Sequence, residues 1–205
     1  MGETGGLGAS PVRPRLATAD DAPAIAAIYR PVVETTAISF ETRAPDDDEM
    51  RGRILETLAT HPWLVLERDG RVAGFAYASR HRARPAYQWS VDTSVYVADE
   101  YRRLGLGRDL YVTLFAILVA QGFVNAYAGI ALPNPASVAF HERLGFESVG
   151  IYRNVGYKLD AWRDVGWWQR PLAMAPGVPS PPESIQRVAQ RADWTAILAG
   201  AAKAP

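Results

Sequence analysis

Apolar residues recur along the chain at two spacings, one typical of amphipathic helices and one typical of strands. The helical spacing predicts helices in segments 18–32, 46–58, 107–121 and 135–144. Their ends carry the expected signals: Thr18 and Asp21 form a capping-box pattern, and Gly122 and Gly145 stand where helices end. We expect strands at 12–16, 63–67, 72–79, 88–97, 127–132, 146–153 and 165–171. Strands and helices mixed in this order predict an α/β or α+β domain around one central sheet.

The two ends of the chain differ in composition from its middle. Residues 1–10 are small and glycine-rich, which predicts a disordered leader before a single domain at 11–173. A proline-rich linker is expected at 174–183, followed by an extension at 184–205. The extension has apolar residues that suit one short helix, docked on the domain or on a partner.

Charge and residue usage exclude several classes of protein. Lys plus Arg is 22 and Asp plus Glu is 22, a balance that argues against a general nucleic-acid binder. No apolar run is long enough to span a membrane and no signal peptide is visible, so we expect a cytoplasmic protein. The chain has no cysteine, and its three histidines lack metal-ligand spacing, so we expect no metal. The missing cysteine also excludes an acyl-cysteine intermediate.

A strand, a glycine-containing loop and a helix follow one another at 88–121. Gly105 and Gly107 let the backbone approach a ligand closely, and the start of the helix contributes partial positive charge. Arg102, Arg103 and Arg108 add full positive charges. The segment therefore suits a phosphate group, although a plain turn at a helix start would also explain the two glycines.

A second segment, 130–146, has a strand, a turn bearing Asn134, a short helix and the sequence Leu-Gly-Phe. Arg-x-x-Gly-x-Gly at 102–107, followed by this arrangement, resembles the GNAT acetyltransferases over about residues 13–172. Segments 36–42, 82–89, 132–137 and 164–169 resemble, more narrowly, the phosphinothricin N-acetyltransferase family.

The resemblance implies a GNAT fold, a central mixed and mostly antiparallel sheet flanked by helices. It also implies transfer of the acetyl group of acetyl-CoA to the α-amine of a small amino acid, such as phosphinothricin, methionine sulfoximine or methionine sulfone. Direct attack in a ternary complex is expected, in a homodimer that detoxifies such compounds. The residues implied to hold acetyl-CoA are Val95, Tyr96, Val97, Arg102, Arg103, Leu104, Gly105, Leu106, Gly107, Arg108, Asn134 and Ser137. Asn134 would equally serve as a helix cap.

Two residues are candidates for the proton transfers. Asp92 stands where the family usually has Glu, and its side chain is one methylene shorter. His141 matches the histidine of the phosphinothricin branch and suits either a base or an acid. Either residue could instead be structural, and which of them is the base stays open. A backbone N–H near Val95, freed by a bulge in the strand, would stabilise the acetyl oxygen.

The acceptor carries a carboxylate and a polar head, for which arginine is suited. Arg82 and Arg84 match basic positions of the family, and Phe40 and Tyr87 match aromatic ones, so these four are the candidate substrate-binding residues. A solvated basic loop or a subunit contact would also explain the arginines.

Two other functions stay open at this point. One is a GNAT enzyme for another primary amine, a polyamine or a peptide N-terminus, although the basic loop at 80–84 disfavours a polyamine. The other is an acetyl-CoA-binding module without turnover, which the phosphate loop fits equally well. Retention of Asp92 and His141 favours an enzyme.

Overall fold

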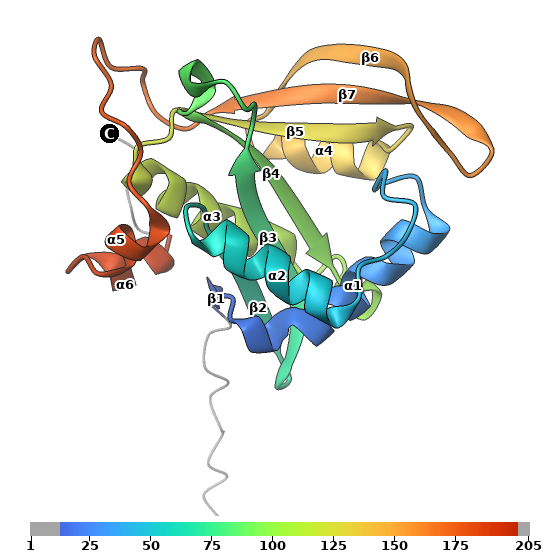
Figure 1. Ribbon diagram of the computed structural model, residues 1–205, viewed down its shortest axis with the longest axis horizontal. Helices are drawn as coiled ribbons and strands as arrows, with labels where there is room; N and C mark the ends of the chain where they lie inside the picture. Colours follow the sequence, from blue (N-terminus) through green and yellow to red (C-terminus); the bar gives the residue numbers. More distant parts are fainter. Residues whose placement is uncertain (1–12, 201–205) are drawn as a thin grey trace, which may run out of the picture.

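The computed structural model describes residues 13–200, so the predicted leader lies outside the described part of the chain. Seven strands form one sheet in the order β1-β2-β3-β4-β5-β7-β6. Helices lie on both faces of this sheet (Figure 1). The strands are β1 (Arg15–Leu16), β2 (Trp63–Arg68), β3 (Arg71–Arg80), β4 (Ser90–Val97), β5 (Asn125–Leu132), β6 (Glu147–Lys158) and β7 (Ala161–Pro171). The helices are α1 (Ala22–Thr35), α2 (Asp47–Leu58), α3 (Leu106–Gln121), α4 (Pro135–Arg143), α5 (Ile185–Ala189) and α6 (Trp194–Leu198).

Local capping explains why the four long helices begin and end close to the predicted positions. Asp46 accepts a hydrogen bond from the Glu49 N–H at the start of α2, and the Glu49 carboxylate accepts one from the Asp46 N–H. A 3-10 turn at Ala19–Asp21, whose capping box joins Thr18 and Asp21, precedes α1. Gly122 ends α3 with a φ of 94°, a conformation that glycine adopts without steric cost.

The parallel contact between β4 and β5 is short, and it opens the sheet. All other neighbouring strands pair antiparallel, whereas β4 and β5 pair only at Ser90–Asp92 against Asn125–Tyr127. Beyond these residues the two strands diverge, as Figure 1 shows. The mixed and mostly antiparallel sheet that the sequence predicted is therefore confirmed, with a split at its centre.

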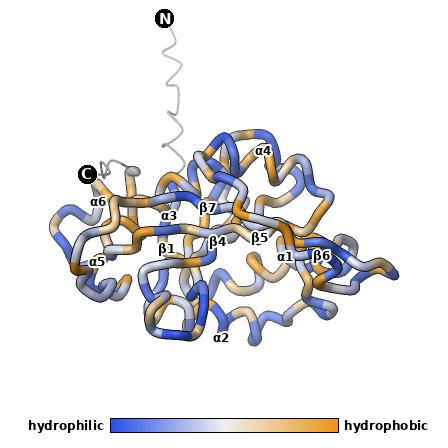
Figure 2. The backbone as a smooth tube through the Cα atoms, turned by 90° about the horizontal axis from the view of Figure 1, so that it is seen from above, coloured by the Kyte–Doolittle hydropathy of each residue, from blue (hydrophilic) through white to orange (hydrophobic). Residues whose placement is uncertain are grey.

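Each face of the sheet has its own hydrophobic core. One core packs α1 and α2 against residues such as Trp63 and Phe75, and the other packs α3 against residues such as Leu64 and Val91. Figure 2, seen from above, shows α2 and α4 on opposite sides of the strands. Because successive strand residues point to opposite faces, the position of a residue in β4 decides which core it joins.

The C-terminal extension forms two five-residue helices in place of the expected single helix. Both α5 and α6 pack on α3, and Ile185, Val188 and Ile197 join its core. The Ser184 side chain caps the start of α5. Asp193 is the N-cap residue of α6 and follows the turn between the two helices. The extension is thus docked on the domain, one of the two placements that its apolar residues predicted.

The last two strands are longer than predicted and form one hairpin. Asn154 and Gly156 interrupt the apolar alternation, so the pattern indicates an end near residue 153. In the structure the pairing of β6 with β7 shifts between Tyr152 and Gly156 and then continues to Lys158. Among residues 13–200, no helix is both long and apolar enough to cross a membrane.

Candidate active site

A cavity of about 840 Å³ lies at the split between β4 and β5. Its walls come from the end of β4, the loop before α3, the first turn of α3, and α4. Val32 and Ile38, from α1 and the loop that follows it, also line it, so the cavity borders elements on both faces of the sheet. Most of the predicted acetyl-CoA residues line it: Val95, Tyr96, Val97, Arg102, Arg103, Gly105, Leu106, Gly107, Arg108, Asn134 and Ser137. Leu104 does not line this cavity, and half of its surface is exposed.

The loop before α3 has the backbone shape expected of an anion site. Arg103 and Gly105 have φ values of 62° and 87°, which turns the loop sharply into the helix. Helix α3 starts at Leu106, and its first N–H groups have no partner within the helix. A Cβ on Gly107 would lie 3.4 Å from the Phe140 ring, so the glycine leaves this space between the start of α3 and α4 unfilled. These features fit a pyrophosphate.

The outer edge of β4 presents unpaired backbone groups to the cavity. The Ala98 N–H donates to Ala73, and the Asn125 N–H donates to the Trp89 carbonyl, so odd-numbered residues of β4 direct their backbone groups toward β5. Val95 lies beyond the last β5 pair, and its N–H therefore faces the split. The predicted bulge near Val95 is absent, because β3 and β4 pair without any register shift. Divergence of the two strands exposes the N–H instead.

His141 lies in α4, is 6% exposed, and borders the cavity. Its Nδ1 donates to the Ser137 carbonyl oxygen at 2.8 Å. In the neutral ring the lone pair is therefore on Nε2, which accepts from the Tyr111 hydroxyl at 3.2 Å. Burial lowers the pKa of His141, with the Ser137 hydrogen bond acting in the opposite direction. The neutral imidazole is thus the form favoured at neutral pH.

Asp92 lies in β4 and has a hydrogen-bond partner that the sequence did not predict. The Asp92 Oδ1 is 2.6 Å from Nδ1 of His81, the residue that follows β3. Burial raises the pKa of Asp92, while the His81 hydrogen bond opposes the rise. Asp92 is therefore a partly buried carboxylate whose charge depends on His81.

Asp92 and His141 belong to opposite faces of the sheet. Val91 and Val95 pack in the core of α3, and Tyr96 packs in the core of α1 and α2. By the alternation of strand residues, Asp92 shares the face of Tyr96. His141 contacts Tyr111 in the α3 core and lines the cavity, whereas Asp92 does not line it. A reaction served by both residues would therefore take place where β4 and β5 begin to diverge beyond Asp92.

The four predicted substrate residues lie outside the cavity wall, and all four are exposed. The Arg82 guanidinium lies 5.2 Å from the ring centre of Trp167, and the Tyr87 ring meets His81 edge to face. The Phe40 ring covers Gly156 of β6, where a Cβ would lie 2.2 Å from a ring carbon. Arg84, in the same loop as Arg82 and Tyr87, precedes the 3-10 turn at Pro85–Tyr87.

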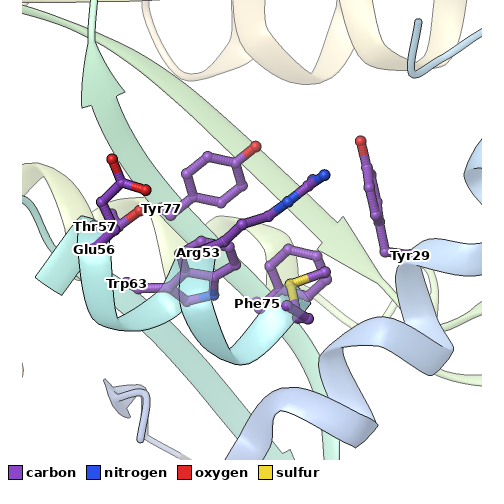
Figure 3. Close-up of a pocket in the computed structure, with 8 residues that line it drawn as sticks. Tyr29, Arg53, Glu56, Thr57, Trp63, Phe75 and Tyr77 are labelled. Atoms are coloured by element: carbon purple, nitrogen blue, oxygen red, sulfur yellow. The ribbon is translucent and has the colours of Figure 1, made fainter. Parts of the chain in front are cut away.

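The loop that carries Phe40 is held by a buried lysine and by polar groups that line a smaller cavity. The Lys158 Nζ donates to the carbonyl oxygens of Val33 and Ser39, both at 2.6 Å. The smaller cavity has a volume of about 160 Å³ and lies between α2 and the sheet. Figure 3 shows Arg53 extending from α2 toward Tyr29. Arg53 and Tyr29 both donate to the Glu41 carboxylate, so their polar groups anchor the loop.

The comparisons with known proteins agree with this fold. Residues 15–167 match the model of the acetyltransferase (GNAT) domain, so the chain belongs to the GNAT acetyltransferases. Its relatives include the phosphinothricin N-acetyltransferase of Streptomyces viridochromogenes, 42% identical over 88% of this chain and 96% of the relative. The L-methionine sulfoximine/L-methionine sulfone acetyltransferase of Pseudomonas aeruginosa is 37% identical over 73% of this chain and 88% of that protein.

A solved structure shows the same architecture. The phosphinothricin acetyltransferase of Sinorhizobium meliloti, in complex with acetyl-CoA, has a TM-score of 0.79 and 34% identity. The match covers 83% of this chain and 94% of that one. The predicted GNAT fold and the predicted family are therefore confirmed.

Two side chains of the candidate site, Tyr111 and His81, could not be predicted from the sequence. Tyr111 lies among the apolar residues of α3 and has the pattern of a core aromatic. His81 lies between two arginines in a polar loop, and nothing in the local pattern connects it with Asp92. The sequence offered only two signals for these roles. One is a tyrosine near the start of the helix that follows the phosphate loop, and the other is a histidine that follows a strand.

Proposed function

We propose that this protein transfers the acetyl group of acetyl-CoA to the α-amine of a small amino acid of the phosphinothricin, methionine sulfoximine or methionine sulfone type. The observation that carries the proposal is the cavity at the strand split. The end expected to bind phosphate lies at α3, and the opposite wall includes Val32 of α1 and Ile38, which belongs to the same loop as Phe40. The names of the curated relatives support this choice of acceptor.

The chemistry of the cavity residues fits acetyl-CoA. Arg103, Arg108 and the first N–H groups of α3 would hold the pyrophosphate. The free edge of β4 would pair with the amides of the pantetheine arm as an added strand does. Asn134 accepts from the Ser137 N–H at 3.1 Å, so it caps α4 and still has its amide hydrogens for that arm.

The reaction forms a nitrogen–carbon bond and breaks a carbon–sulfur bond. The acceptor enters as an ammonium ion and loses two protons overall. A basic group that includes Asp92 takes the first proton and releases it to solvent, and the second proton ends on the sulfur of CoA. The Val95 N–H donates to the acetyl oxygen, where negative charge develops. The side chains act from opposite faces, which keeps the two proton transfers apart.

We assign the leaving-group side to His141 and Tyr111. Both lie on the α3 face, and His141 lines the same cavity as the residues that would hold the pantetheine arm. The neutral form of His141 holds one proton, which it shares with the Ser137 carbonyl oxygen. The Tyr111 hydroxyl donates to Nε2 in the resting pair. To serve the sulfur, Nε2 takes up the second proton of the amine and passes it to the departing thiolate, while the Tyr111 hydroxyl turns to accept from the ring.

Recognition of the acceptor is assigned to Arg82, Arg84, Phe40 and Tyr87. The two guanidinium groups suit a carboxylate and a tetrahedral oxygen-bearing head. Phe40 and Tyr87 supply flat apolar surface beside them. Because all four come from loops outside the cofactor cavity, they can select the acceptor without changing how acetyl-CoA is held.

The test is a thiol-release assay with acetyl-CoA and a panel of acceptors. The panel holds phosphinothricin, methionine sulfoximine, methionine sulfone, methionine, glutamate, spermidine and a peptide N-terminus. Turnover on the first three supports the proposal. Turnover only on spermidine or the peptide would move the function to another primary amine, and binding of acetyl-CoA without any turnover would favour a binding module.

We also propose that the enzyme is a homodimer that acts in the cytoplasm on compounds that need detoxification, without nucleic-acid or membrane partners. The hairpin of β6 and β7 lies at one edge of the sheet and exposes several large apolar side chains, which favours a protein–protein contact there. These side chains are Val149, Ile151, Tyr152, Val155, Tyr157 and Trp162. Trp167, by contrast, packs against Tyr152 and His81, and Trp168 is buried in the core. Sedimentation equilibrium tests the dimer, and Trp162→Glu should shift the protein to monomer if this surface forms it.

A further inference from the structure

The hydrogen bond between His81 and Asp92 joins a histidine to one of the two candidates for the base. The donor and acceptor atoms, Nδ1 and Oδ1, are 2.6 Å apart. An ionised carboxylate only accepts, so Nδ1 carries the hydrogen, and the lone pair of the neutral ring is on Nε2. Within residues 13–200, Nε2 forms no hydrogen bond. The pair thus presents an unoccupied basic nitrogen rather than a carboxylate alone.

Aromatic side chains hold the His81 ring in place. It stacks on Tyr127 of β5 with ring centres 4.2 Å apart and an angle of 14° between the planes. The edges of Tyr87 and Trp167 meet it from two other elements. Its side chain is 11% exposed, so it is enclosed but still reachable.

The position of His81 relates it to the acceptor. Arg82, which follows it, donates to the His81 carbonyl oxygen and lies over Trp167. Arg82 and Tyr87 are two of the four residues assigned to acceptor recognition, and both contact the surroundings of the His81 ring. The Asp92 carboxylate is hydrogen-bonded to the ring, and the Arg82 guanidinium lies over Trp167, whose edge meets the ring.

We propose that His81 is the proton acceptor for the ammonium group of the acceptor, through Nε2, and that Asp92 holds the ring in the required tautomer. This inference rests on the proposed acetyl transfer. The proton passes from the ammonium nitrogen to Nε2, and the electron pair of the broken N–H bond stays on the amine as the attacking pair. The imidazolium is stabilised by Asp92 and later releases its proton to solvent. Aspartate is one methylene shorter than glutamate. An imidazole between Asp92 and the amine supplies the reach that the shorter side chain lacks.

The decisive comparison is between His81→Asn and His81→Ala. An asparagine amide can still donate to Asp92, but it cannot take up a proton. We expect both variants to bind acetyl-CoA normally and to lose kcat by a similar factor, about 10²- to 10⁴-fold. If His81→Asn retains most of the kcat while His81→Ala does not, His81 only positions Asp92 and the proposal is wrong.

Chemical rescue gives a second readout that a purely structural role would not move. Added imidazole should restore part of the kcat of His81→Ala, and more basic substituted imidazoles should restore more. No rescue at any concentration would contradict the proton-acceptor role. His61→Asn is the matched control, because His61 stacks on Phe123 away from the site, and it should change neither kcat nor the response to imidazole.

A measurement without turnover separates this proposal from the proposed function. Long-range proton–nitrogen NMR spectra of the full chain report which ring nitrogen of each histidine carries the hydrogen, and the Asn variants assign the signals. We expect His81 protonated on Nδ1, and loss of that preference in Asp92→Asn. A wild-type His81 protonated only on Nε2 would overturn the proposal whatever the acceptor, whereas failure of the acceptor panel with the expected tautomer would fault the proposed substrate class alone.

Discussion

Asp92 and His141 lie on opposite faces of strand β4, and the split beside that strand is where their chemistry can meet. Asp92 shares its face with Tyr96 and binds His81, while His141 binds Tyr111 in the α3 core. In the mechanism that we propose, this arrangement would separate removal of the amine proton from delivery of a proton to sulfur. It also means that substitutions on the two faces should have separable effects.

Replacing the residues of the α3 face should impair turnover while binding of acetyl-CoA persists. His141→Ala removes the partner of the Tyr111 hydroxyl, and we expect kcat to fall about 10²-fold or more. Tyr111→Phe leaves the buried Nε2 without a donor, which should cost about 1–3 kcal/mol of folding free energy and lower kcat. Steady-state kinetics and calorimetric binding of acetyl-CoA check both. Normal turnover in His141→Ala would remove this assignment.

The phosphate loop offers a test that involves only backbone shape. Gly105→Ala places a Cβ on a residue with a φ of 87°, at a cost of about 1–2 kcal/mol. We expect a higher Kd for acetyl-CoA and a lower melting temperature. Gly52→Ala in α2 is the matched control, because nothing lies within 4 Å of its Cβ position. It should raise stability by about 0.5–1 kcal/mol and leave the Kd unchanged.

Gly156→Ala should affect the acceptor rather than acetyl-CoA. The new Cβ would lie 2.2 Å from the Phe40 ring, so the ring must move. We expect KM for the amino acid to rise several-fold while KM for acetyl-CoA holds. Gly150→Ala, in the same strand and with open space around its Cβ position, serves as control. Equal KM values for both variants would argue against Phe40 as part of the acceptor site.

The Phe40 loop should also give the protein a measurable acid sensitivity. The Arg53 hydrogen bonds hold the pKa of Glu41 below its ordinary value of 4.5. The unfolded chain therefore binds this proton at a higher pH than the folded protein does, so the contribution is complete above about pH 5 and is lost as the pH falls further. Because the pair is partly exposed, the contribution is about 0.5–1 kcal/mol. Urea unfolding of Glu41→Gln should show a smaller loss of stability between pH 5 and pH 3 than the wild type.

Arg82 and Arg84 can be ranked by substitution with glutamine. Arg82 lies over Trp167 beside the His81 ring, so Arg82→Gln should raise KM for acceptors with a tetrahedral head more than KM for methionine. Arg84→Gln, at the start of the 3-10 turn, should raise KM for all amino acids through their common carboxylate. Identical profiles for the two variants would show that neither arginine distinguishes the head group.

The sequence predicted most elements because their signals are local. Asp46 caps α2 through its neighbour Glu49, and Gly122 ends α3 through its own backbone, so neither depends on the rest of the fold. The same is true of the glycines in the phosphate loop. The resemblance to a family then placed His141 and Asp92.

What could not be predicted depends on contacts between distant segments. His81 follows β3 and meets Asp92 only because β3 and β4 pair with Ser79 opposite Asp92. The Val95 N–H is free because β5 diverges, a property of two strands and not of one. We expected a bulge within β4 to free this N–H. The opening arises instead between two strands, where β5 diverges from β4.

The short seam between β4 and β5 has a thermodynamic consequence. Three residue pairs join two leaves of sheet, β1–β4 and β5–β7, and beyond Asp92 the outer edge of β4 lacks a neighbouring strand. A pantetheine arm that pairs with this edge would complete the sheet, so binding and consolidation of the two leaves would be one event. The stability of the folded protein should then rise with the logarithm of the acetyl-CoA concentration above its Kd. The enzyme would thereby be most resistant to unfolding and proteolysis when its acetyl donor is abundant.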